Sequence, residues 1–108
     1  MKFEDLQKQV LDWAEEKDLL HEENKNKQFM KFIEEVFEFK MEMDLGVSSD
    51  YIKLEMGDIF VTLIILCKQL DIDSMECLDL AYRKIKGRNG KTINGTFVKS
   101  EDLENARV

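Results

Sequence analysis

The chain has 108 residues and a formal net charge of −7, from 23 acidic and 16 basic residues. This length suits one domain with one modest core, so we expect residues 1–108 to form a single domain. The acidic balance argues against general binding to nucleic acid, because phosphate backbones repel a negatively charged surface. The chain has no proline, five glycines and 36% charged residues, which is typical of a helical protein with solvated outer faces.

No segment of the sequence is expected to enter a membrane. The N-terminal residues, MKFEDLQKQV, mix charged and apolar side chains and lack the apolar centre of a signal peptide. The longest apolar run, Ile59 to Cys67, is interrupted by Thr62 and is far shorter than the roughly 20 residues that span a bilayer. Cys67 and Cys77 belong to no CxxC pair, so we interpret both as buried apolar residues. These features predict a cytoplasmic protein without a membrane partner.

Two helices are expected in the first half of the chain, because apolar residues recur there at spacings of three and four. The first covers residues 3–20, and its apolar face consists of Phe3, Leu6, Val10 and Trp13. Residues 21–27, HEENKNK, are polar and are expected to form a connection. The second covers residues 28–45, and its apolar stripe consists of Phe29, Phe32, Val36, Phe39 and Met43. Gly46 is expected to end this helix.

Two further helices are expected at residues 51–70 and 74–86. The third is apolar nearly all round after Asp58, which is typical of a helix buried in a bundle or at a subunit interface. Asp73 or Ser74 can cap the fourth. Residues 90–108 are expected to form a short irregular tail that holds a hairpin around Asn94-Gly95. The predicted fold class is therefore all-α: a four-helix bundle-like domain with a short C-terminal tail.

Carboxylates on the second and third expected helices form two local patterns. Glu34, Glu35 and Glu38 lie on the second helix, and Glu55 and Asp58 lie on the third. A spacing of three places Glu35 and Glu38 on one helix face, and it does the same for Glu55 and Asp58. The third helix becomes apolar directly after its pair, so these charges are costly unless something compensates them. A divalent cation would do so, and ligation by oxygen alone selects Mg²⁺ or Mn²⁺.

Other interpretations of these carboxylates stay open. Acidic residues at such spacings usually form a solvated helix face, and the chain would then be a non-catalytic acidic helical interaction module. A second alternative keeps the metal but acts on another nucleotide phosphate ester. A di-iron site is disfavoured, because such bundles use Glu-x-x-His pairs and the one histidine, His21, lies in a connection.

The order EExxE followed by ExxD resembles the signature of MazG-like all-α nucleoside triphosphate pyrophosphohydrolases. The matching residues are Glu34, Glu35, Glu38, Glu55 and Asp58. The runs QFMKFIEE, DIFVTLI and AYRKIKGR are also similar to the family pattern, so the resemblance covers roughly residues 13–99. The overall form looks most like the short MazG-like proteins of bacteria and their phages. One departure is Phe37, at a position where the family often has glycine.

The resemblance implies a Mg²⁺-dependent enzyme that hydrolyses a nucleoside triphosphate to the monophosphate and pyrophosphate. It would serve nucleotide-pool control or the removal of non-standard nucleotides. By matching position, Glu35, Glu38, Glu55 and Asp58 are the implied metal ligands, with Mn²⁺ as an alternative ion. Glu34 joins Glu35 and Glu38 as an implied catalytic residue that holds a second metal or orients the attacking water. The family also implies a homodimer or homotetramer with sites near subunit interfaces.

Cations and an aromatic residue are expected to complete such a site. Lys31 lies one turn before Glu35 on the same helix face, where its ammonium group can reach a phosphate. Lys84 and Arg88 share a face of the fourth helix and can hold a phosphate tail. Trp13 is the candidate platform for the base. The alternatives are an ordinary surface role for the three cations and a core position for Trp13.

Overall fold

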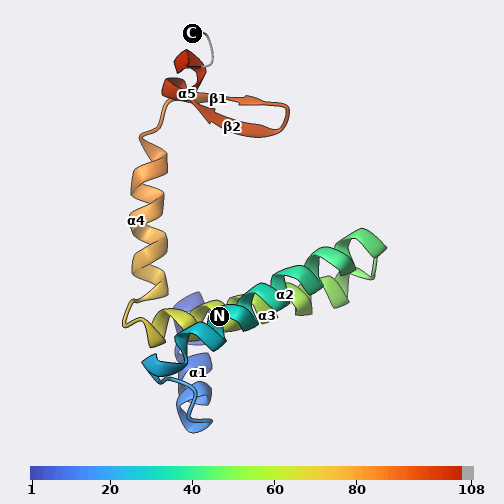
Figure 1. Cartoon of the computed structure of the whole chain (residues 1–108), viewed down its shortest axis with the longest axis vertical. Helices are drawn as coiled ribbons and strands as arrows, with labels where there is room; N and C mark the ends of the chain where they lie inside the picture. The colour runs from blue at the N-terminus through green and yellow to red at the C-terminus, as the bar shows by residue number, and fades with distance from the viewer. Residues whose placement is uncertain (106–108) are drawn as a thin grey trace. The chain divides into compact units, whose positions relative to one another are not determined.

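The computed structural model describes the backbone of residues 1–105 and the side chains of residues 1–103. The described chain is mostly helical, as expected, with one small antiparallel sheet of two strands near the C-terminus (Figure 1). It divides into two compact units, Met1–Glu76 and the part of the chain from Cys77 onward. No helix among the described residues has both the length and the apolar character needed to cross a membrane.

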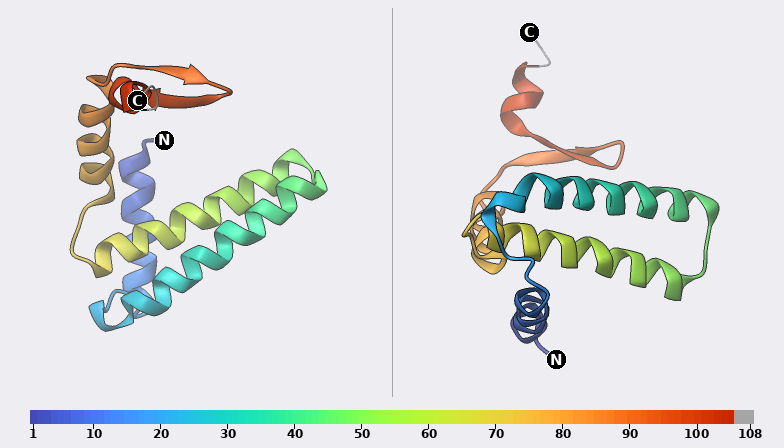
Figure 2. Two further views of the ribbon diagram at one scale, coloured as in Figure 1. Left: turned by 45° about the horizontal axis from the view of Figure 1, so that its top comes forward. Right: turned by 60° about the horizontal axis from the view of Figure 1, so that its bottom comes forward.

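The first unit is a helical hairpin crossed by a third helix. Its elements are α1 (Phe3–Glu16), the short 3₁₀ helix η1 (Glu22–Asn24), α2 (Lys25–Leu45) and α3 (Ser49–Gln69). Helices α2 and α3 lie side by side and antiparallel, and α1 packs across the C-terminal half of α3 (Figure 2). The ring of Phe3 meets the ring of Phe60 edge-on at a centroid distance of 6.3 Å. The side-chain amide of Gln7, one turn further along α1, donates to Asp73 at 3.0 Å.

The core of the first unit lies where α1 crosses α3. Ala14 of α1 is fully buried, and Ile64 and Ile65 of α3 are 5% and 3% exposed. Two polar residues of α3, Thr62 and Gln69, are buried in the same region. The Thr62 hydroxyl donates to the carbonyl of Ile59 within its own helix. The prediction that α3 is buried on most sides is therefore confirmed for its C-terminal half, where α1 covers it.

All three helices of this unit end in the same backbone arrangement. Asp18, Gly46 and Asp71 each adopt a left-handed conformation, with φ of 60°, 71° and 57°. After each of them, the next amide hydrogen-bonds a carbonyl five residues back, which is the Schellman motif. Gly46 ends α2 as predicted. Helix α1 ends at Glu16 rather than near residue 20, because Asp18 takes the left-handed position that its side chain tolerates.

The start of α2 also differs from its predicted position. The helix begins at Lys25, three residues before the expected start, and it follows η1 without a break. The polar composition of residues 21–27 suggests a connection, but polar side chains are compatible with a solvated first turn. The bounds of α3, Ser49–Gln69, lie within two residues of those predicted.

The second unit follows the first turn of α4 (Ser74–Lys86), whose bounds agree with the prediction. The carboxylate of Asp73 accepts a hydrogen bond from the Met75 amide at 3.2 Å and so caps this helix as expected. The hydrogen bond from Gln7, and after it the one from Met75, holds the pKa of Asp73 below its ordinary value. Cys77 is exposed in the described part of the chain, so the prediction that it is buried is wrong, whereas Cys67 is buried as predicted.

The C-terminal segment contains a hairpin and a short helix. Strands β1 (Gly90–Ile93) and β2 (Thr96–Lys99) pair around Asn94 and Gly95, as predicted, and α5 (Ser100–Asn105) follows. The expectation of an otherwise irregular tail is wrong up to residue 105, because α5 packs on both strands. Gly90 permits the close approach of the strands, since a Cβ there would lie 2.3 Å from the carbonyl oxygen of Val98. Residues 106–108 lie outside the described part of the tail.

Candidate metal centre

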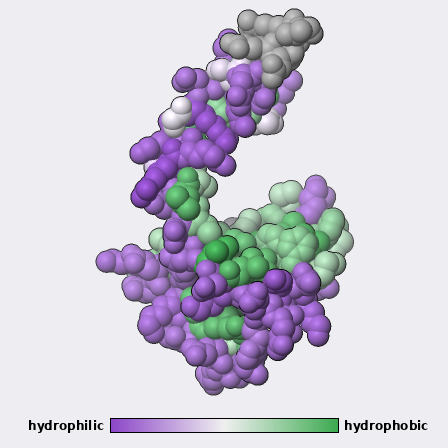
Figure 3. Space-filling model, turned by 60° about the vertical axis from the view of Figure 1, so that its left-hand side comes forward, coloured by the Kyte–Doolittle hydropathy of each residue, from purple (hydrophilic) through white to green (hydrophobic). Residues whose placement is uncertain are grey.

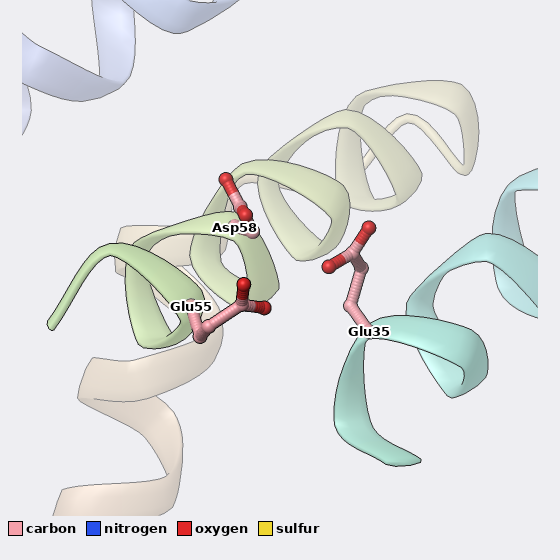
Figure 4. Close-up of side chains that lie close together, drawn as sticks. All are labelled: Glu35, Glu55 and Asp58. Atoms are coloured by element: carbon pink, nitrogen blue, oxygen red, sulfur yellow. The ribbon is translucent and has the colours of Figure 1, made fainter. Parts of the chain in front are cut away.

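Three of the four predicted metal ligands meet between α2 and α3. Glu35 extends from α2 toward α3, where Glu55 and Asp58 lie one turn apart (Figure 4). One oxygen from each carboxylate lies within 4.8 Å of the other two. Along the sequence, the acidic motif of α2 and that of α3 are separated from the connection between the helices by similar numbers of residues. Antiparallel packing therefore brings the two motifs opposite one another.

The cluster is enclosed on one side and open on the other. Glu35 and Glu55 are half-buried, and Asp58 is exposed. The Oε2 atom of Glu55 is buried and has no hydrogen-bond donor among the described residues. A carboxylate oxygen in this situation is costly, because it has lost water without gaining a partner. A cation bound between the three carboxylates would remove that cost.

The electrostatics of the cluster agree with this geometry. Burial raises the pKa of Glu35, and the negative charges of Glu38 and Asp58 raise it further. The positive charge of Lys31 acts in the opposite direction. Together these effects mean that the cluster holds more negative charge than its surroundings readily support.

Tyr51 borders the same cluster from the start of α3. The charges of Glu42 and Glu55 raise the pKa of its hydroxyl group, and a hydrogen bond to Glu55 adds to the effect. The hydroxyl group therefore keeps its proton at neutral pH. Tyr51 is a neighbour of Glu55 that the sequence analysis did not identify, since an aromatic residue at helical spacing carries no such signal.

The donor set fits a hard divalent cation. Mg²⁺ binds oxygen at about 2.1 Å, so oxygens that share one octahedral ion lie about 3–4 Å apart. The three carboxylate oxygens already lie within 4.8 Å of one another, and small side-chain rotations can close the remaining gap. Three protein ligands would leave further positions on such an ion for water or phosphate oxygens.

The other two predicted carboxylates lie beside the cluster and not within it. Glu38 is exposed one turn after Glu35 on α2, and its charge acts on both Glu35 and Tyr51. Glu34 is exposed on α2 as well. Ligation by Glu38 and catalysis by Glu34 thus stay predictions, with both side chains accessible to solvent.

A pocket of about 540 Å³ lies next to the carboxylates in the first unit. Its wall includes Trp13 from α1, Gln28 and Lys31 from α2, and Thr62 and Gln69 from α3. Lys31 lies one turn before Glu35, and Thr62 lies one turn after Asp58, so the pocket continues along both helices from the cluster. The structure therefore brings the predicted residues Trp13 and Lys31 to one cavity, although α1 and α2 are separate elements.

The remaining predicted residues, Lys84 and Arg88, belong to the second unit. Lys84 is exposed on α4. Arg88 follows that helix and lines a small polar pocket together with Lys99 and Ser100. The contact of these two cations with phosphate stays a prediction.

Comparison with known proteins gives a similarity to a phage protein. Over 76 residues the chain is 38% identical to the "uncharacterized 18.2 kDa protein in rep-hol intergenic region" of Haemophilus phage HP1 (strain HP1c1). The match covers 68% of this chain and 44% of the phage protein, so the chain spans less than half the length of that relative. No family model and no solved structure matches the chain.

Proposed function

We propose that the protein is a Mg²⁺-dependent nucleoside triphosphate pyrophosphohydrolase of the MazG-like type. The observation that carries the proposal is the meeting of Glu35, Glu55 and Asp58, with a buried Glu55 oxygen that lacks a donor among the described residues. The adjacent pocket supports it, since Lys31 and Trp13 offer a cation for phosphate and a ring for a base. The mostly helical fold is compatible with a MazG-type bundle.

Each residue would have a distinct task in the reaction. Glu35, Glu55 and Asp58 hold the ion, with Mn²⁺ as an alternative to Mg²⁺. The bound ion supplies charge neutralisation at the phosphate oxygens and lowers the pKa of water. The Lys31 ammonium group binds a phosphate oxygen from the pocket wall. Glu38 and Glu34, which are exposed beside the cluster, are the carboxylates that can orient the attacking water and accept its proton.

The proposed enzyme is a homodimer or homotetramer. The far half of the α2–α3 hairpin exposes large apolar side chains, among them Phe37, Leu45 and Leu54 at 66%, 77% and 66%. Apolar patches are visible on the molecular surface in Figure 3. Exposed apolar patches of this kind mark interaction sites, because covering them removes apolar surface from water and lowers the free energy.

The same apolar surface favours the alternative of a non-catalytic helical interaction module. The two functions differ in their dependence on metal. A module needs no cation, and it would keep its partner when the carboxylates are neutralised. An enzyme would lose its activity under the same change.

The test is pyrophosphate release from a panel of ribo- and deoxyribonucleoside triphosphates, with and without Mg²⁺. The Glu55→Gln variant keeps the size of the side chain but removes one ligand charge, and we expect it to lower kcat at least 100-fold. Glu16→Gln, an exposed position at the end of α1, is the matched control and should retain full activity. Release that is independent of Mg²⁺, or equal in both variants, would contradict the proposed function.

A further inference from the structure

The negative charge of the chain is distributed unevenly. Residues 83–99, the basic segment, hold six of the 16 basic residues and no acidic residue, whereas the other ten basic residues are outnumbered by 23 acidic residues elsewhere. The six are Arg83, Lys84, Lys86, Arg88, Lys91 and Lys99. The expectation against nucleic acid follows from the net charge of the whole chain. It does not hold for a segment of opposite sign, because salt confines electrostatic attraction to short distances.

Most cations of the basic segment are not neutralised by a neighbouring acid. Arg83 is paired with Asp79 at 2.6 Å, and the ammonium group of Lys99 lies 3.8 Å from a carboxylate oxygen of Glu101. Among the side chains that the structure describes, the other four basic residues of the segment have no ion-pair partner. The segment therefore presents surplus positive charge to the solvent.

Two of these cations share a pocket that belongs to the second unit alone. Arg88 and Lys99 are both half-buried, and with Asn89, Ser100 and Glu101 they line a pocket of about 360 Å³. Two like charges that have lost part of their water repel one another, and Glu101 supplies a single negative charge. A phosphate group in the pocket would balance both cations, since a guanidinium group can bind two phosphate oxygens at once.

An exposed aromatic ring lies beside this pocket. Phe97 and Lys99 are two residues apart on β2, so their side chains point to the same face of the hairpin. The Phe97 ring lies against Gly90, the strand partner of Lys99, because a Cβ at Gly90 would be 2.5 Å from the ring atom Cζ. Phe97 is nevertheless 48% exposed. An exposed ring next to cations is the arrangement on which the bases of a single strand stack.

We propose that the basic segment binds single-stranded nucleic acid, with a backbone phosphate between Arg88 and Lys99 and a base stacked on Phe97. The cations of the segment that lie outside the pocket favour a ligand with several phosphates over a single phosphate ion. The exposed ring favours a single strand over a duplex, in which the bases already stack on one another. This binding is additional to the proposed hydrolysis and needs no metal.

The experiment uses the full chain in EDTA, so that the carboxylate cluster holds no cation. Binding of a fluorescein-labelled oligothymidylate is measured by fluorescence anisotropy. We expect the affinity to fall about 50-fold between about 50 and 200 mM salt, as the neutralisation of about four phosphates predicts for a single strand. An abasic strand of the same length should bind about tenfold more weakly, because it has no base to stack.

Variants then assign the binding to the pocket and the ring. Arg88→Gln and Lys99→Gln should each weaken binding about fivefold or more, because each removes a phosphate contact. Lys17→Gln removes the same charge at an exposed position after α1 and should keep the wild-type affinity. Phe97→Leu should abolish the difference between the normal and the abasic strand. Phe29→Leu, on an α2 residue with the same 48% exposure, should keep that difference.

The wild-type measurements decide the question even if a variant does not fold. Affinity that does not depend on salt, or that is equal for the normal and the abasic strand, would overturn the proposal. Binding that survives both charge variants in folded protein would overturn the role of the pocket. Binding of pyrophosphate or of anionic phospholipid vesicles, without binding of the strand, would assign the cations to another phosphate ligand and overturn the nucleic-acid partner.

Discussion

The two halves of the α2–α3 hairpin have similar apolar content but very different environments. In the near half, α1 lies across α3, and Ile64, Ile65 and Ala14 are buried. In the far half, no third element of the first unit covers the helices, and residues such as Phe37 and Leu54 are exposed. A pair of helices cannot bury the apolar residues on both of its sides, so a third layer decides which of them form a core.

The carboxylate cluster lies at the boundary between these halves. Residues of α3 after Asp58 enter the covered region, and those before Glu55 remain in the open one. This position leaves Glu55 half-buried and Asp58 exposed, so an ion and a phosphate can approach from solvent. The candidate site therefore depends on α1 indirectly, because α1 covers the near half of the hairpin and forms part of the pocket wall there.

The largest expected effect is the loss of a core side chain in the near half. Ile65→Ala should lower the free energy of unfolding by about 3 kcal/mol, because it removes buried methylene groups and leaves a cavity. Leu54→Ala, in the far half, should cost less than about 0.5 kcal/mol in a monomer. Urea denaturation measures both. A loss at Leu54 that equals the loss at Ile65 and depends on protein concentration would mean that a second copy covers the far half.

The next largest expected effect is stabilisation of the folded chain by Mg²⁺ bound at the carboxylate cluster, between the two halves of the hairpin. Mg²⁺ at 100 times its dissociation constant should raise the free energy of unfolding by about 2.7 kcal/mol, since it binds only the folded cluster. Thermal unfolding with and without Mg²⁺ measures this shift in Tm. Glu55→Gln should lose most of the shift, and Glu16→Gln should keep it. A shift of the same size in both variants would place the bound ion elsewhere.

Substitutions at two glycines of the α2–α3 hairpin should change the free energy of unfolding by smaller amounts. Gly46→Ala should cost about 1 kcal/mol, because Gly46 has a left-handed φ of 71° at the end of α2. Gly57→Ala should stabilise by about 0.5–1 kcal/mol, because Gly57 lies inside α3 and an added Cβ has nothing within 4 Å. Chemical denaturation gives both values. Destabilisation by Gly57→Ala would show that another chain packs closely against that position.

The smallest expected effect concerns pH at the boundary. The pKa of Glu35 is raised above its ordinary value of 4.5, mainly by burial. Its contribution to metal-free stability is therefore complete below that value and is lost as the pH rises through the folded-state pKa. Glu35→Gln should remove this part of the pH dependence and raise the Tm slightly at pH 7 in EDTA. An unchanged pH profile would indicate that Glu35 is not desolvated.

Several local features were predictable because short-range chemistry determines them. The Asn94-Gly95 hairpin, the end of α2 at Gly46 and the cap at Asp73 depend on residues that are neighbours in sequence. The end of α1 was predicted too late, because Asp18 is not a residue that usually takes a left-handed conformation. Helix α5 was missed, since it is short and its contacts with the hairpin are tertiary.

The candidate site was predictable only in part. The acidic spacing placed each carboxylate pair on one helix face, and only the packing of α2 on α3 brings Glu35, Glu55 and Asp58 together while leaving Glu38 exposed beside them. The burial of Gln69 was not predicted, because a single amide in an apolar helix has no local pattern. Its hydrogen bond to Leu19 joins residues 50 positions apart, and sequence spacing carries no information on such a contact.

The sequence by itself determined the helical periodicity, most helix bounds and the acidic motifs of α2 and α3, because each depends on residues within one or two turns. Only the tertiary structure decided which apolar residues form a core, which carboxylates share a cluster and which amide side chains are buried. The physical reason is that α1, the third helical layer, determines which residues of the α2–α3 pair are buried. The crossing of α1 over α3 desolvates Ile65 and Gln69, whereas equally apolar residues of the far half stay in water.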